Sequence, residues 1–289
     1  MATEIAQLID EGVARLARVT DQPRLDAEIL LAAALAKPRS YLLAHPEQRV
    51  FDCEATDRFE AHVTRRAHGE PIAYILGEKE FWSLPIEVGP DVLIPRPETE
   101  LAVELALGRL PASVPGRVLD VATGSGAIAL ALAHERPRQH VIGTDVTEAA
   151  VARARSNAAR LGLANVQFRH GSWFEPVRDE HFTLIVSNPP YIAEDDPRVE
   201  RAVRRFEPHA ALFAGPTGLE ALRVLAAGAP DHLVPGGWLI LEHGDTQAAA
   251  VRDLLHHAGF ESVRTACDLA GRDRCTEGRR PGSARPAGA

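Results

Sequence analysis

The sequence predicts an α/β fold: a doubly wound, mostly parallel sheet that is preceded by a small all-helical domain. Three observations lead to this prediction. Apolar residues recur three and four positions apart from residue 1 to about residue 75. Beyond Glu98, apolar runs of strand length alternate with helical segments, as in sheets that are covered on both faces. A glycine-containing turn joins the first of these strands to the helix that follows it.

Residues 1–76 are the predicted helical domain. The stretches "IAQLIDEGVARLARV", "DAEILLAAALA" and "FEAHVTRRAHG" each have the spacing of an amphipathic helix. Residues 77–97 change to two short alternating pieces, "EFWSLPIEV" and "VLIPRP", which are separated by Gly89 and Pro90. This pattern predicts a β-hairpin connector.

Residues 98–280 are the predicted sheet domain. Strands are expected at "RVLDVA", "HVIGTDV", "VQFRH", "FTLIVS", "GWLILEH" and "ESVRTAC", with helices between most of them. These six apolar runs are typical of strands that are buried on both faces. Residues 281–289 have no apolar periodicity, and we expect a disordered tail there.

Composition excludes several classes of protein. The 289 residues are 45% hydrophobic, yet no apolar run approaches the roughly 20 residues of a membrane span, and the N-terminus does not resemble a signal peptide. A net charge of −8 argues against an extended nucleic-acid footprint. The cysteines and histidines show no metal-binding spacing. We therefore expect a cytoplasmic monomer without a metal, a membrane contact or a direct nucleic-acid partner.

A glycine loop follows the first strand of the sheet domain and precedes a helix. Glycines in such a turn allow a ligand to approach the backbone at the helix N-terminus. Asp145 ends the next strand, where a carboxylate can accept hydrogen bonds from ribose hydroxyls. A nucleoside-bearing cofactor is therefore predicted, with contacts from the loop residues Ala122, Thr123, Gly124, Ser125 and Gly126.

The loop alone leaves the cofactor open. The residues 124–129 also satisfy the G-x-G-x-x-A form of the dinucleotide fingerprint, and a turn needed only for strand-to-helix packing is a further alternative. The pattern D-x-x-T-G-S-G over residues 120–126, however, resembles the first motif of class I S-adenosylmethionine-dependent methyltransferases. On that resemblance, S-adenosylmethionine is the expected cofactor.

The strand "FTLIVS" ends abruptly at Asn188, Pro189, Pro190 and Tyr191. Each proline fixes its own φ, restricts the residue before it and removes a backbone donor. The Asn188 side-chain oxygen and the Pro189 carbonyl are thus predicted acceptors for the two N–H bonds of a planar NH₂ group, which would stack on Tyr191. Asn188, Pro189 and Tyr191 are the expected catalytic residues of a methyl transfer to nitrogen, and positioning is expected to supply most of the catalysis.

An N-P-P-Y motif is shared by methyltransferases that act on adenine, guanine or glutamine amino groups, so other stretches must choose the substrate. The stretches "GEPIAYILGEKEFW", "VLIPRPETE", "DVATGSGAIALALA", "SNPPYI", "RFEPHAALFAG" and "LEHG" occur in this order along the chain. Together they closely resemble the peptide chain release factor glutamine-N5 methyltransferases.

The resemblance implies a class I methyltransferase sheet and a helical domain that docks a release factor. It implies methylation of the glutamine in the factor's Gly-Gly-Gln tripeptide. Carried over by motif, the loop 122–126, Asp145, Trp173 and Asn188 contact the cofactor, and residues 188–191 bind the glutamine. Residues 96–100 and 206–208 look like walls of the same pocket.

Glu98 and Glu207 lie within these two wall segments, and for them a helix-terminal or ion-pair role is an equal alternative. The sequence departs from the family pattern at two positions. Ala122 replaces a usual glycine, and we predict an ordinary negative φ there, because a positive φ costs alanine on the order of 1 kcal/mol. Ser172 replaces a usual acidic residue, which removes an expected contact to the adenine amino group.

Three rival functions remain open at the level of sequence. A DNA or RNA amino-methyltransferase would place a flipped base in the same pocket. A nicotinamide-dependent oxidoreductase would use the alternative glycine fingerprint. A noncatalytic binding module on this fold is the third rival.

Overall fold

The computed structural model describes residues 3–282, which form two compact units. One unit comprises the chain up to Glu78 together with Arg201–Phe206, and the other comprises Lys79–Glu200 with the chain from Glu207 onward. From residue 283 on, the predicted disordered tail lies outside the described residues. Within residues 3–282, no helix has both the length and the apolar character needed to span a membrane.

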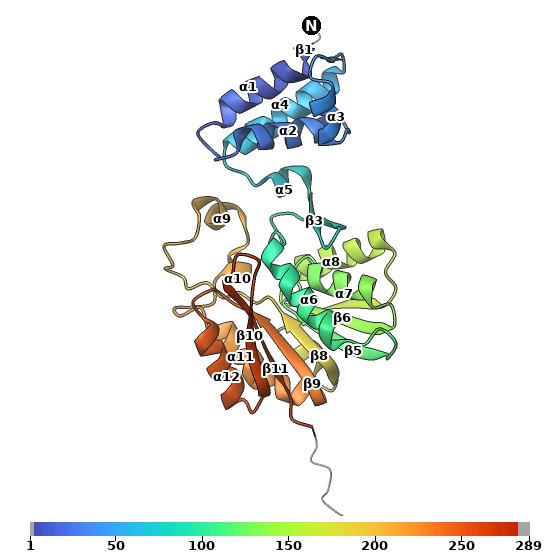
Figure 1. The fold of residues 1–289 in the computed structure, drawn as a ribbon, viewed down its shortest axis with the longest axis vertical. Helices are drawn as coiled ribbons and strands as arrows, with labels where there is room; N and C mark the ends of the chain where they lie inside the picture. The colour runs from blue at the N-terminus through green and yellow to red at the C-terminus, as the bar shows by residue number, and fades with distance from the viewer. Residues whose placement is uncertain (1–2, 283–289) are drawn as a thin grey trace, which may run out of the picture. The chain divides into compact units, whose positions relative to one another are not determined.

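The first unit is mostly helical, and its N-terminal helices form a small bundle (Figure 1). Its elements are β1 (Thr3–Glu4), α1 (Ile5–Leu16), α2 (Pro23–Ala34), α3 (Arg39–Ala44), β2 (Arg49–Val50), α4 (Cys53–Ala67), α5 (Ile72–Leu76) and α9 (Arg201–Phe206). Leu16, Leu30 and Phe59 are fully buried in its core. Gly12 permits the close packing of α1, because a Cβ there would lie 3.0 Å from both Ala27 and Phe59. The apolar residues that recur with helical periodicity therefore pack together in one small core.

A β-hairpin follows, formed by β3 (Glu78–Phe81) and β4 (Leu84–Glu87). Its turn lies at Trp82 and Ser83, with φ of 52° and 58°. Two positive φ values match the right-handed twist of a two-residue hairpin. The hairpin was expected in this region, but its turn lies earlier than Gly89-Pro90, and residues 92–97 form no strand.

The second unit is built on a seven-stranded sheet with the strand order β10-β11-β9-β8-β5-β6-β7. Its strands are β5 (Gly116–Val121), β6 (Gln139–Asp145), β7 (Val166–His170), β8 (Phe182–Ser187), β9 (Leu233–Glu242), β10 (Glu261–Cys267) and β11 (Asp273–Arg279). Its helices are η1 (Pro97–Thr99), α6 (Glu100–Arg109), α7 (Ala127–Glu135), α8 (Glu148–Leu161), η2 (Glu175–Val177), α10 (His209–Leu212), α11 (Glu220–His232) and α12 (Ala248–His257). Strands β5 to β9 pair in parallel, which confirms the predicted doubly wound α/β fold.

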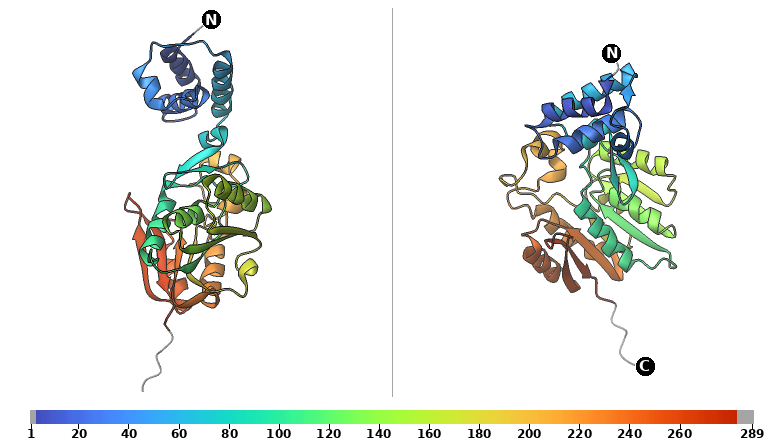
Figure 2. Two further views of the ribbon diagram at one scale, coloured as in Figure 1. Left: turned by 90° about the vertical axis from the view of Figure 1, so that its right-hand side faces the viewer. Right: turned by 45° about the horizontal axis from the view of Figure 1, so that its top comes forward.

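Helices cover both faces of this sheet (Figures 1 and 2). Leu119 and Val121 of β5 belong to the core that includes Leu222 of α11 and Val251 of α12. Asp120 points to the opposite face, where it accepts a hydrogen bond from the first turn of α7. Burial on both faces explains why the strands of this unit read as continuous apolar runs.

Strand β11 was not predicted, because "DRCTEGR" reads as a polar segment. It pairs antiparallel with β9 and β10, and its Glu277 side chain is 1% exposed. Arg109 of α6 binds both oxygens of this carboxylate at 3.0 and 2.7 Å, and Arg264 also contacts it. Burial alone would raise the pKa of Glu277, but the two guanidinium groups hold it below its ordinary value. An ion pair formed only in the folded chain thus permits a polar strand inside the sheet.

We expect Arg109→Met to lower the free energy of unfolding by about 3 kcal/mol, because Glu277 would lose its bidentate partner while staying buried. The guanidinium also lies 3.7 Å above the Trp238 ring, a contact that methionine replaces only in part. The loss should shrink as the pH falls toward the lowered pKa of Glu277 and this carboxylate takes up a proton. Urea unfolding at pH 7 and at acid pH measures both effects.

Arg264→Met is the matched control, because Arg264 contacts the same carboxylate but its side chain is 62% exposed. It should cost about 1 kcal/mol or less. Equal losses for the two variants would contradict the assignment of Arg109 as the main partner.

Candidate active site

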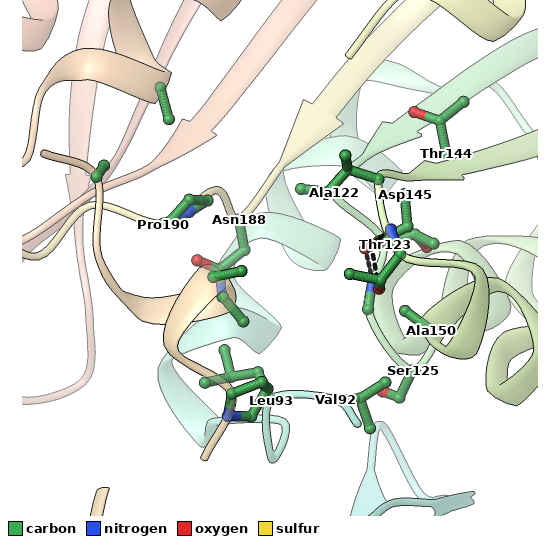
Figure 3. Close-up of a pocket in the computed structure, with 18 of the residues that line it drawn as sticks. Val92, Leu93, Ala122, Thr123, Ser125, Thr144, Asp145, Ala150, Asn188 and Pro190 are labelled. Atoms are coloured by element: carbon green, nitrogen blue, oxygen red, sulfur yellow. Dashed lines mark hydrogen bonds between the residues drawn. The ribbon is translucent and has the colours of Figure 1, made fainter. Parts of the chain in front are cut away.

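A cavity of about 480 Å³ lies where β5, β6 and β8 end (Figure 3). The order of strands along the chain reverses between β5 and β8, and such a switch point is where open α/β sheets bind ligands. The predicted site residues on its wall are Ala122, Thr123, Gly124, Ser125, Asp145, Trp173, Asn188 and Pro190. Three further predicted residues, Gly126, Pro189 and Tyr191, do not line it. Most of the predicted site is therefore brought together at one place.

Ala122 has a φ of 59°, so the prediction of a negative φ at this position was wrong. The backbone beyond it is fixed on both sides. The Thr123 N–H donates to the Thr144 carbonyl of β6 at 2.9 Å, and the Gly124 N–H donates to Asp145 Oδ2 at 2.9 Å. These two bonds hold the loop against β6 and force the left-handed turn, whose cost to alanine is about 1 kcal/mol.

Asp120 anchors the loop from its inner side. Its Oδ2 accepts from the Thr123 hydroxyl at 2.6 Å and from the Ala129 N–H at 3.1 Å, while Oδ1 is buried without a partner. Burial raises the pKa of this carboxyl to about 7. Gly126 completes the turn with a φ of 85°, and a Cβ there would lie 3.1 Å from three neighbouring side-chain atoms. Asp120 and Gly126 thus shape the loop without lining the cavity.

Asp145 joins the loop to the start of α8. Its Oδ2 accepts from Gly124, and its Oδ1 accepts from both the N–H and the hydroxyl of Thr147 at 2.9 Å. A carboxylate has about four acceptor positions, so these three bonds leave capacity for a ligand hydroxyl. Asp145 therefore has the position and the free acceptor that the sequence predicted for it.

Trp173 reaches the cavity from the segment after β7. It has a φ of 46°, its carbonyl accepts from the Thr144 hydroxyl at 3.2 Å, and its ring packs against the sheet core. Ser172 also lines the cavity and is exposed. Val146 adds an apolar surface that is 60% exposed. This side of the cavity offers flat and apolar surfaces with one hydroxyl, and Ser172 supplies no carboxylate.

Asn188 and Tyr191 lie at the end of β8, where two different anchors hold them. Asn188 Nδ2 donates to the Thr99 hydroxyl oxygen at 3.0 Å. The Tyr191 hydroxyl donates to Glu242 Oε1 at 3.1 Å, and the Tyr191 carbonyl accepts from Gln247 at 3.0 Å. Burial, followed by the nearby Glu242, raises the pKa of the Tyr191 hydroxyl well above its ordinary value. Tyr191 therefore stays a neutral phenol and is held beside the cavity.

The two wall segments that the sequence indicated are tied together by an ion pair. Glu207, whose side chain is 1% exposed, binds Arg96 at 2.5 Å and accepts from the Ile94 N–H at 3.1 Å. This contact holds the stretch from Val92 to Thr99 beside the segment that begins at Glu207. Glu207 does not line the cavity, so the structure favours its ion-pair role over a place in the pocket wall. Glu98 is exposed.

Comparisons with known proteins identify the family. A family model described as "PrmC N-terminal domain" matches residues 7–77, and one described as "Methyltransferase small domain" matches residues 98–219. A release factor glutamine methyltransferase from Xylella fastidiosa is 52% identical over 271 residues, which are 93% of this chain and 98% of the relative. Its counterpart from Vibrio cholerae is 50% identical over 260 residues, with 90% of each chain covered.

The chain belongs to the release factor glutamine methyltransferase family. It shares its fold with other methyltransferases as well. The T. thermophilus 16S rRNA N2 G1207 methyltransferase superposes with a TM-score of 0.53 at 20% identity, covering 70% of this chain and 49% of that one. At this identity the likeness concerns the fold alone.

In this member of the release factor glutamine methyltransferase family, sequence reasoning missed several residues of the site. Thr99 lines the cavity and binds Asn188, and Glu242 binds Tyr191. Thr99 belongs to residues 96–100, which the sequence indicated as a wall of the pocket, but its bond to Asn188 was not predicted. Glu242 lies within "LEHG", which carried the family resemblance, but it had no predicted role. The apolar wall at α10 and α11 includes Ala211, Phe213 and Val224. Ala211 and Phe213 lie within "RFEPHAALFAG", which also carried the resemblance, whereas Val224 had no signal in the sequence. Among residues 3–282, no group of three or more His, Cys, Asp or Glu side chains could hold a metal ion.

We expect Ala122→Gly to raise the free energy of unfolding by about 0.5 kcal/mol. Glycine relieves the left-handed strain but loses about 0.4–1 kcal/mol to the greater freedom of the unfolded chain. Ala127→Gly is the matched control, because it makes the same change in the first turn of α7, where it should cost about 1 kcal/mol. Urea unfolding compares the two variants, and equal losses would show that Ala122 is unstrained.

Proposed function

We propose that this protein transfers the methyl group of S-adenosylmethionine to the side-chain amide nitrogen (N5) of a glutamine in peptide chain release factors. Membership in the family supports this reaction. The observation that carries it is the place of Asn188 on the wall of the cavity, beside the loop from the adjacent strand β5. As the sequence resemblance implies, the glutamine belongs to the factor's Gly-Gly-Gln tripeptide.

The cavity fits S-adenosylmethionine by size and by chemistry. Its volume of about 480 Å³ lies in the range of sites for ligands of this class. Asp145 would hold the ribose hydroxyls, and the backbone of the loop 122–126 would lie against the rest of the cofactor. Trp173 and Val146 would pack against the adenine. When bound, the cofactor supplies an activated methyl group on a sulfonium.

Asn188 would orient the substrate amide. An amide nitrogen is a poor nucleophile, because its lone pair is delocalised into the carbonyl. The Asn188 side-chain oxygen can accept one of its N–H bonds, and the Pro189 carbonyl is the proposed acceptor for the other. Together they would turn the nitrogen toward the methyl group and favour the positive charge that develops on it. Pro189 and Tyr191 do not line the cavity, so their contacts to substrate stay predictions.

The site needs no strong general base for this reaction. Positioning of the two reactants supplies most of the rate, because the methyl donor is already activated. The raised pKa of Tyr191 excludes that phenol as a base near neutral pH. The proton would leave to solvent from the methylated amide, which is a strong acid while it carries a positive charge.

A DNA or RNA amino-methyltransferase is the second candidate function. The fold does not separate the two, since it is shared with an rRNA methyltransferase. The net charge of −8 and the identity to release factor glutamine methyltransferases favour the protein substrate. We also propose that the enzyme acts as a cytoplasmic monomer, which size-exclusion chromatography with light scattering would test for mass.

Methyl transfer from labelled S-adenosylmethionine should be detected with an intact release factor. It should be absent with the Gln→Ala variant of its Gly-Gly-Gln tripeptide, because alanine has no amide nitrogen. Scintillation counting and mass spectrometry of the tripeptide locate the methyl group. Equal transfer to both factors, or transfer to nucleic acid in place of protein, would overturn the glutamine assignment.

Asn188→Ala should lower kcat by at least about 100-fold, because the substrate amide loses its side-chain acceptor. Binding of S-adenosylhomocysteine, measured by calorimetry, should change by less than about threefold, since most of the cofactor contacts lie elsewhere in the cavity.

Asn165→Ala is the control, because Asn165 Nδ2 only bridges backbone carbonyls such as that of Ala133 at 3.0 Å. That variant should lose stability and keep its kcat. An Asn188→Ala enzyme with ordinary turnover would contradict the proposed mechanism.

A further inference from the structure

The Asn188 carboxamide has two chemically different ends, and only one of them suits the substrate. A glutamine NH₂ offers two donors, so the side chain that receives it must present its oxygen and not its own NH₂. In the structure Asn188 Nδ2 donates to the Thr99 hydroxyl oxygen at 3.0 Å. With its donor end held in this way, the carboxamide leaves Oδ1 free for the cavity.

Thr99 alone cannot impose this orientation, because a hydroxyl both donates and accepts. If the Thr99 proton pointed at Asn188, the carboxamide could turn over and present its NH₂ to the cavity. The direction of the bond therefore depends on what receives the Thr99 proton. Thr99 is 3% exposed and lies at the end of η1, so that receiver must be another buried group and not bulk water.

Glu242 is that buried group. It ends β9, is 1% exposed, and lies beside the end of β8, where Leu241 pairs with Ser187. Its Oε1 accepts from Tyr191 at 3.1 Å. The Thr99 hydroxyl acts on this carboxyl as a hydrogen-bond donor and lowers its pKa. Its Oε2 is buried without a hydrogen-bond partner, so the carboxyl has an acceptor position open to the Thr99 hydroxyl. Hydrogen bonds at active sites often tighten only when substrate binds.

An ionised carboxylate accepts hydrogen bonds and donates none. An ionised Glu242 would therefore fix the direction of each hydrogen bond from Glu242 through Thr99 to Asn188. If Thr99 donates its proton to the ionised Glu242, the Thr99 lone pair faces Asn188, and Asn188 must offer its N–H. We propose that Glu242, acting through Thr99, is a positioning residue that turns the Asn188 side-chain oxygen toward the substrate amide. This inference rests on the proposed glutamine methyl transfer.

The protonation state of Glu242 should make kcat depend on pH, which can be measured. Burial raises its pKa to about 7, against the opposing effects of Thr99, Arg274 and Tyr191, while Glu98 raises it further. Cys275, on the neighbouring strand β11, also faces it. Below pH 7 the protonated carboxyl can donate to Thr99. Thr99 can then donate to Asn188, and the carboxamide is no longer required to present its N–H to Thr99. The kcat should therefore rise as the pH increases through about 7.

Three variants test the proposal, with a release factor as substrate. Thr99→Val keeps the shape of the side chain but removes the acceptor, and it should lower kcat by about 10- to 100-fold, as expected for a misplaced reacting group. Thr99→Ser restores the hydroxyl and should keep kcat within about threefold of the parent enzyme. Glu242→Gln should lower kcat and flatten its rise near pH 7, because glutamine has no ionisation. The affinity for S-adenosylhomocysteine, measured by calorimetry, should stay within about threefold in all three.

Thr183→Val is the matched control. The Thr183 hydroxyl donates to the Arg117 carbonyl at 2.8 Å, near the opposite end of β8, and does not line the cavity. Its loss should leave kcat unchanged.

The outcomes separate the two proposals. If the parent enzyme methylates no release factor, the proposed function fails. If the parent is active and Thr99→Val keeps more than half of its kcat, the positioning chain is overturned. The same conclusion follows if Thr99→Ser is as inactive as Thr99→Val, since a hydroxyl would then be irrelevant. Should Glu242→Gln fail to fold, the two Thr99 variants still decide the result.

Discussion

The pairing of β5 with β8 is the contact on which the site depends. Val121 and Ser187 are partners in the parallel register, and the Ser187 hydroxyl donates to the Val121 carbonyl at 2.6 Å across 66 residues of sequence. Both strands end at this pair, so the glycine loop and Asn188 begin at the same level of the sheet. A shift of one residue would displace one of them by about 3.3 Å and turn its side chains to the other face. The core that buries both strands therefore also fixes the distance between the two halves of the site.

Buried and half-buried carboxyl groups then hold the segments around the site. Asp120 accepts from a backbone N–H of α7, Asp145 from one in the glycine loop, and Glu207 from that of Ile94. Loop backbone has no sheet or helix partners of its own, and a carboxylate can satisfy several donors at once. The loops are thereby shaped before any ligand arrives, and a preorganised site loses less conformational entropy on binding.

Signals that lie within one element were readable from the sequence, and those that depend on distant partners were not. The strands from β5 to β10 and the residues from Asn188 to Tyr191 follow from apolar runs and from proline chemistry. Strand β11 was missed because its Glu277 is neutralised by Arg109, 168 residues away in sequence. The φ of Ala122 was predicted wrongly, because bonds to β6 decide it and local propensity does not. Thr99 belonged to an indicated pocket wall, but its bond to Asn188 became visible only in the fold.

Two fully buried glutamates on neighbouring strands show where stability has yielded to function. Glu277 is matched by arginines, which hold its pKa below the ordinary value in spite of burial. Glu242 is equally buried, yet its pKa rises to about 7 and its Oε2 lacks a partner. Because the folded pKa lies above the ordinary one, this carboxyl stabilises the fold only in its protonated form, and that contribution is lost as the pH rises toward 7. A glutamine or an apolar side chain would fill the same space without this cost. Of these two glutamates, Glu242 is the one whose charge is destabilised by burial, and it binds the tyrosine of the N-P-P-Y motif. A charged group that is retained at such a cost is typical of a functional site.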